Sequence, residues 1–65
     1  MTFREEFICF RALNKITVRA VWHKAGVAPA TIVKFEKGER VFKSTEERLR
    51  KFMEDYNAEK TYQEN

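Results

Sequence analysis

Glycine and proline interrupt this chain at only three positions, and all three lie near its middle. The 65 residues contain two glycines, Gly26 and Gly38, and one proline, Pro29. These residue types end helices more often than most others, because glycine favours positive φ and proline lacks a backbone N–H. The sequence therefore predicts short helices with sharp turns at both glycines, and a positive φ at Gly26.

Apolar residues elsewhere recur three or four positions apart, which is the spacing of a helix with one buried face. This spacing predicts helices over residues 2–13, 17–25, 29–37 and 45–56, and no segment has the pattern of a strand. We therefore expect an all-α fold, a compact four-helix domain over residues 1–57. A frayed C-terminal tail is expected over residues 58–65, where the apolar pattern stops.

Residues at the expected helix ends support these boundaries. Thr2 and Thr17 precede the first two helices and are N-cap candidates, and Pro29 suits the first turn of the third. Asn14 is expected to end the first helix in a left-handed conformation. Ser44, with a glutamate three residues later, predicts a capping box at the start of the fourth helix.

The apolar stripes of the four segments are expected to meet in one core, and Trp22 lies on one of these stripes. The expected core residues are Phe3, Phe7, Phe10, Leu13, Val18, Val21, Trp22, Ala25, Val27, Ile32, Phe35, Leu49, Phe52, Met53 and Tyr56. Four further apolar side chains lie off the stripes and are expected to be available to a partner: Ile8, Cys9, Val41 and Phe42.

The size and composition of the chain argue against several classes of protein. A chain of 65 residues allows one small domain and is too short for most catalytic clefts. One histidine and one cysteine supply neither a metal cluster nor a nucleophilic triad, so we expect no enzyme, metal or cofactor. No apolar run approaches the ~20 residues of a membrane span, and two glutamates near the start argue against a secretory signal. We expect a cytoplasmic protein, a setting that suits a single cysteine.

Positive charge is concentrated in the middle of the chain. Eight basic and two acidic residues lie between Arg11 and Lys43, whereas the two flanking segments together hold five basic and eight acidic residues. A basic surface between acidic ends is typical of a protein that binds a polyanion such as nucleic acid. A lysine-rich solvated surface is the alternative, and charge alone does not separate the two.

The segment from Ile16 to Gly38 carries the most specific pattern: two short helical stretches joined by a turn with glycine. It resembles the core of the Cro/C1-type regulators, which are xenobiotic-response-element-type, lambda-repressor-like helix-turn-helix proteins. The matching residues are Ala25-Gly26-Val27, Thr31-Ile32 and Phe35-Glu36-Lys37-Gly38. The resemblance spans about residues 7–56 and implies a helix-turn-helix motif over residues 17–37. It also implies a bacterial, phage or mobile-element regulator that binds operator DNA as a dimer.

The chain departs from this family's pattern in three places. Val18 stands where the family often has a glutamine that helps to hold a phosphate. Trp22 stands where a small residue usually lies between the two motif helices, so the crossing must open or the indole must tilt outward. Family members usually have a fifth helix, which this chain is expected to lack.

The resemblance makes the third helix the one that enters the major groove of DNA. Residues expected to read bases, or to lie at the margins of that face, are Pro29, Ala30, Thr31, Val33 and Lys34. Residues expected to contact phosphates are Lys15, Thr17, Arg19, Lys24, Lys37, Arg40 and Lys43. The expected function is sequence-specific binding of double-stranded DNA by a transcriptional repressor.

An alternative hypothesis is that this helix-turn-helix fold binds another regulatory protein, as an antiactivator or antirepressor. The absent glutamine and a third helix without Arg, Asn or Gln favour it, and so do the apolar side chains off the stripes. If the protein binds DNA, we expect a homodimer. The surface of this chain that contacts the second copy, or another partner, is expected to involve Ile8, Phe42, Phe52 and Tyr56, with Cys9 and Tyr62 beside them.

Overall fold

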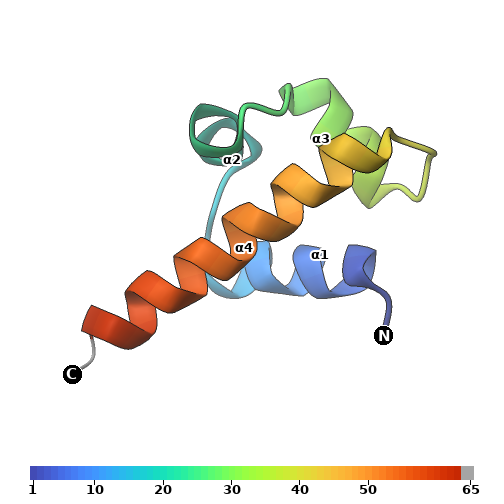
Figure 1. Cartoon of the computed structure of the whole chain (residues 1–65). Helices are drawn as coiled ribbons and strands as arrows, with labels where there is room; N and C mark the ends of the chain where they lie inside the picture. The colour runs from blue at the N-terminus through green and yellow to red at the C-terminus, as the bar shows by residue number, and fades with distance from the viewer. Residues whose placement is uncertain (64–65) are drawn as a thin grey trace.

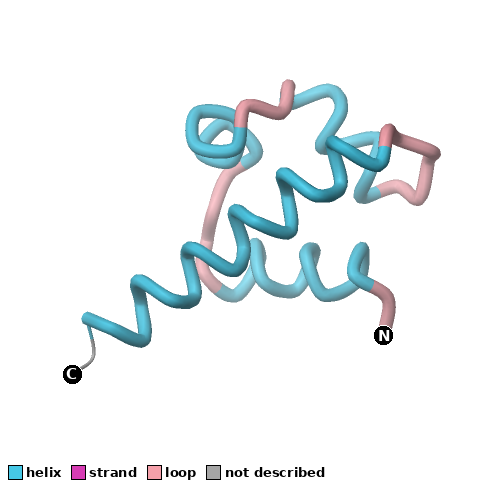
Figure 2. The backbone as a smooth tube through the Cα atoms, viewed as in Figure 1, coloured by secondary structure: helices cyan, strands magenta, loops and turns pink. Residues whose placement is uncertain are grey.

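A computed structural model describes residues 1–63 of the chain, and their side chains as far as Lys60. The described residues form four helices and no strand: α1 (Phe3–Leu13), α2 (Val18–Ala25), α3 (Pro29–Glu36) and α4 (Lys43–Gln63) (Figure 2). The predicted all-α class is therefore confirmed. No helix in this part of the chain combines the length and the apolar character needed to cross a membrane.

The short pair α2 and α3 lies above α1 in the view of Figure 1. Both α4 and α3 contact α1 and α2, and α4 crosses the molecule diagonally (Figure 1). Each helix contributes one side chain with no exposed surface: Phe7, Val21, Ile32 and Leu49. The core is thus a single cluster that all four helices share.

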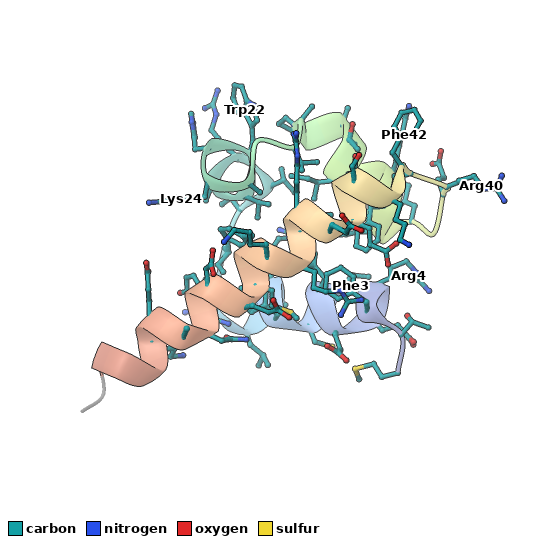
Figure 3. All side chains as sticks on the ribbon, in the orientation of Figure 1. Phe3, Arg4, Trp22, Lys24, Arg40 and Phe42 are labelled. Carbon is teal, nitrogen blue, oxygen red and sulfur yellow. The ribbon has the colours of Figure 1, made fainter. Side chains whose placement is uncertain are left out.

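Aromatic rings fill most of the space between α1 and its neighbours. Phe7 lies 5.9 Å from Phe10 and 6.0 Å from Phe35, measured between ring centroids. Phe3 lies between α1 and α4, where the Arg50 guanidinium sits 4.1 Å above its ring (Figure 3). Such edge and tilted contacts add to the burial of apolar surface. The expected apolar stripe of α1 is therefore confirmed at its phenylalanines but not at Leu13, whose side chain is 83% exposed.

The N-caps of the first two helices are those that the sequence predicts, and Ala28 is the N-cap of α3, without a side-chain capping hydrogen bond. The Thr2 hydroxyl accepts from the Glu5 backbone N–H at 3.2 Å, and the Glu5 carboxylate accepts from the Thr2 backbone N–H at 2.9 Å. The hydrogen bonds that the Thr2 backbone N–H and hydroxyl donate to the Glu5 carboxylate lower the pKa of Glu5. Thr17 accepts from the Ala20 backbone N–H at 3.1 Å, and Pro29 occupies the first turn of α3.

Two predicted helix ends are wrong in detail. Asn14 is the C-cap of α1 but has φ −99°, and the left-handed residue is its neighbour Lys15, with φ 54°. Ser44 is not an N-cap, because α4 begins one residue earlier, at Lys43. The carbonyl of Phe42 instead accepts from the N–H groups of the first turn of α4.

The last helix is longer than its apolar pattern indicates. We predicted a frayed tail from residue 58, but α4 continues to Gln63 and projects beyond the other helices (Figure 1). No glycine or proline follows Gly38, and good helix formers need no buried face to extend an existing helix. The Lys51 ammonium lies 2.9 Å from the Asp55 carboxylate, and Lys60 donates to the Asn14 side chain at 3.1 Å. Of these two contacts, the hydrogen bond of Lys60 lies in the extension and joins it to the end of α1.

Gly26 has the positive φ that the sequence predicts, at 73°, and ends α2 in the left-handed conformation. A Cβ at this position would meet only an Arg48 nitrogen at 3.9 Å, so backbone strain and not a clash opposes substitution. We therefore expect Gly26→Val to lower the free energy of unfolding by at least about 1–2 kcal/mol. Urea unfolding measures this, with Ala30→Val, at an exposed helical position, as the control. Equal stabilities of the two variants would contradict the assigned turn.

Candidate functional site

The outward face of α3 carries the residues that were predicted to read bases. Ile32 and Phe35 point into the core, which leaves Ala30, Val33 and Lys34 exposed on the opposite side. Val33 is 40% exposed. Pro29 and Thr31 are half-buried and lie at the margins of this face, as expected. The face is thus accessible, mainly small and apolar, and carries one ammonium group.

A charged pair that sequence reasoning missed fixes the C-terminal end of α3. The Arg11 guanidinium binds both oxygens of the Glu36 carboxylate, at 2.7 and 2.8 Å, and donates to the Ile16 carbonyl at 3.0 Å. Arg4 donates to the Glu36 carbonyl at 3.3 Å. The hydrogen bond to Glu36 raises the pKa of Arg11. Because the Glu36 side chain is only 15% exposed and turned toward α1, its negative charge is largely removed from the outer face of α3.

The predicted phosphate-binding residues fall into separate groups. Lys37 and Arg40 are exposed on the connection from α3 to α4, Lys43 is exposed at the start of α4, and Arg19 is exposed on α2. Lys24 and Arg40 point away from the body at opposite sides of the molecule (Figure 3). The remaining residues of this set line a groove beside α4: Lys15, Thr17 and Lys24. The structure therefore places one set of these residues beyond the C-terminal end of α3 and another set in the groove beside α4.

The groove beside α4 has a volume of about 720 Å³ and runs between α4 and α2 with the preceding turn. At one end the Arg48 guanidinium lies beside Gly26, and at the other Lys60 reaches Asn14. Its floor contains Ile16 and the half-buried rings of Phe52 and Tyr56. No α3 residue lines it. The groove is therefore a surface distinct from the outward face of α3.

Trp22 is not in the core, so this prediction is wrong. The indole is 41% exposed and stacks on His23, with 4.8 Å between ring centroids and 28° between planes. It points outward from α2 (Figure 3). Val21 of α2, Val27 of the turn and Ile32 of α3 are the buried residues of this part of the chain. A large residue at this position, where a small one was expected, is thus accommodated because the ring tilts outward.

The residues predicted for a partner surface differ in accessibility. Phe42 is 82% exposed and extends from the connection before α4 (Figure 3), whereas Ile8 is half-buried. Phe52 and Tyr56 contact Phe10, with ring centroids 6.0 and 5.3 Å away, so they already belong in part to the core. Cys9 is exposed, and Val41 packs against the core and is not surplus. Tyr62 lies outside the residues whose side chains are described.

Nothing in the described part of the chain gathers three or more His, Cys, Asp or Glu side chains as a metal site would. No protein-family model, curated protein or solved structure matches the chain. The resemblance to Cro/C1-type regulators therefore rests on the motif residues between Ile16 and Gly38. The structural features available for a function are the outward face of α3, the basic groups around it and the groove beside α4.

Proposed function

We propose that the chain is a lambda-repressor-like helix-turn-helix protein that binds double-stranded DNA, with α3 in the major groove. The observation that carries this proposal is the charge of the surface around α3. No acidic residue lies between Arg11 and Phe35, and the one carboxylate of α3, on Glu36, is bound by Arg11. The outer face of α3 is consequently free of acidic side chains, as contact with a polyanion requires.

Base contacts would be few and would come from the middle of α3. Lys34 can donate to guanine O6 and N7 or to a phosphate, and Ala30 and Val33 can contact the methyl group of thymine. The face lacks Arg, Asn and Gln, the side chains that bind base edges through two hydrogen bonds. Phosphate contacts would therefore supply much of the affinity.

Phosphate contacts are available beyond the C-terminal end of α3, where the chain turns into α4. Lys37, Arg40 and Lys43 are all exposed there, and Gly38, with φ 89°, turns the chain between the first two. Arg19, exposed on α2, offers a further cation. A helix in the major groove, which is about 12 Å wide, passes between two phosphate backbones, so cations on either side of α3 suit this mode. Such a protein would repress transcription by occupying a promoter.

Nuclear magnetic resonance of the labelled protein tests this placement. We expect a short DNA duplex at low salt to shift the backbone amide signals of Ala30, Thr31, Val33, Lys34 and Lys37 most strongly. Signals from the exposed C-terminal end of α1, such as those of Ala12 and Leu13, serve as an internal control and should stay unchanged. Shifts confined to α4 or α1, or none at all, would contradict a role for α3 in the groove.

A second candidate function, binding of another regulatory protein, is favoured by the exposure of Phe42. An aromatic ring that is 82% exposed on a connecting segment is a typical anchor for a protein partner. On this alternative, Phe42→Asp abolishes function in cells while duplex binding is unaffected. On the DNA proposal the same variant retains function, provided that circular dichroism shows an unchanged melt.

A further inference from the structure

Three exposed side chains of α2 belong neither to the core nor to the groove beside α4. Trp22 and His23 lie three and four positions after Arg19, so the three residues share one side of the helix. Ala20 and Lys24 lie on another side and line the groove, whereas none of the three does. Arg19, Trp22 and His23 make up the α2 face, and packing within the fold does not account for the exposure of its indole.

The α2 face offers hydrogen-bond donors and positive charge, and no carboxylate. The indole of Trp22 and the guanidinium of Arg19 donate through N–H groups and accept nothing, and α2 contains no acidic residue. The indole is 41% exposed and stacks on the imidazole of His23, with 4.8 Å between the ring centroids. The stack restricts rotation of the indole, so less conformational entropy is lost when the ring contacts a ligand. Such a surface suits an anion.

The indole of the α2 face is turned to the same side of the molecule as the outward face of α3. Phe35, on the inward side of α3, lies 6.0 Å from Phe7 of α1, and α1 lies below α3 in Figure 1. The outward face of α3 is therefore directed upward in this view. Trp22 also extends upward from α2 in the same orientation (Figure 3). A duplex held by the outward face of α3 would therefore pass beside Trp22.

We propose that the α2 face binds the sugar–phosphate backbone of the DNA strand beside α2, with the Trp22 N–H donating to a phosphate oxygen. The Arg19 guanidinium binds a phosphate of the same strand, and His23 holds the indole in place. This inference rests on the proposed function, because it requires α3 in the major groove. Backbone contacts carry no sequence information, so the indole adds affinity for every duplex and does not select among sequences.

The variant Trp22→Phe keeps an aromatic ring beside His23 and removes the indole N–H. We expect its dissociation constants for duplexes of different sequence to rise together by about 10-fold, the effect of losing one hydrogen bond to a charged group. Leu13→Ala is the control, because it shortens an exposed apolar side chain on α1 and should leave these constants unchanged. Circular dichroism melts show whether each variant is folded.

Tryptophan fluorescence gives a second readout on the unaltered protein, because Trp22 is the one tryptophan of the chain. Acrylamide quenches an exposed indole by collision, and a bound backbone shields it. We therefore expect a duplex at low salt to reduce the quenching of the wild-type protein. Lys34→Glu, which is expected not to bind the duplex, should be quenched equally with and without DNA.

Two outcomes would overturn the role of the α2 face while leaving the proposed function standing. They are a folded Trp22→Phe variant that binds duplexes as tightly as the wild type, and a wild-type protein that binds a duplex without any change in quenching. The quenching result does not require the variant to fold. A wild-type protein that binds no duplex at low salt would overturn the proposed function and this inference with it.

Discussion

Replacing Lys34 by glutamate is expected to abolish sequence-selective binding to duplex DNA while leaving the fold intact. Lys34 is exposed in the last turn of α3, and its ammonium is the one cationic group among the predicted base-reading residues. A good base contact contributes about 1–3 kcal/mol, and a carboxylate in its place adds repulsion from phosphates. We expect the dissociation constant to rise at least about 100-fold in a titration of labelled duplex.

A matched control reverses a lysine that lies away from α3. Lys60→Glu makes the same change of charge near the projecting end of α4, and we expect only a small, non-specific weakening of binding. Lys37→Glu should also abolish binding, but mainly through phosphates. Removal of any one of Lys37, Arg40 and Lys43 should reduce the magnitude of the slope of log affinity against log salt by about 0.9 for the lost phosphate contact. Equal effects of Lys34→Glu and Lys60→Glu would mean that overall charge and not the α3 face determines binding.

Truncating Phe7 to alanine is expected to unfold most of the protein at moderate temperature. The ring has no exposed surface and contacts the rings of Phe3, Phe10 and Phe35. Loss of a buried phenylalanine costs about 3–5 kcal/mol. A domain of this length has a total stability of only about 3–10 kcal/mol. Thermal melting followed by circular dichroism should show the midpoint lowered by about 12 °C or more, or no cooperative transition.

Phe42→Ala is the matched control for this effect, because it removes the same ring from an exposed site. The Phe42 side chain is 82% exposed, so we expect a change in stability of less than about 0.5 kcal/mol. A melt of Phe42→Ala that falls as far as that of Phe7→Ala would show that the core is not the cluster around Phe7.

Features that depend on local chemistry could be predicted from the sequence. The left-handed turn at Gly26, the N-cap at Thr2 and the position of Pro29 each follow from one residue's local preferences. The buried stripe of α1 follows from its phenylalanine spacing, although Leu13 is 83% exposed while the next residue, Asn14, still accepts a hydrogen bond from Lys60 of α4. Helical periodicity identifies which side of a helix is apolar, but not which residue at the margin of that side a neighbouring helix covers.

Features that depend on packing between distant segments could not be predicted in this way. The Arg11–Glu36 pair joins α1 to α3 across 25 residues, and an arginine in a basic segment gives no sign of such a partner. Trp22 is apolar and correctly spaced, yet it is 41% exposed, while its neighbour Val21 is buried instead. The length of α4 was missed because its last turns, including Ala58 and Glu59, are exposed and need no apolar stripe.

Selection of bound DNA from a pool of random duplexes, followed by sequencing, tests whether the protein recognises a specific DNA sequence. We expect wild-type protein to enrich a short motif, Lys34→Glu to enrich none, and Lys60→Glu to enrich the wild-type motif. If the protein binds DNA as the expected homodimer, the motif occurs as two inverted half-sites. A folded wild-type protein that enriches no sequence at low salt, and that co-purifies in one-to-one ratio with another protein, would contradict DNA binding as its function.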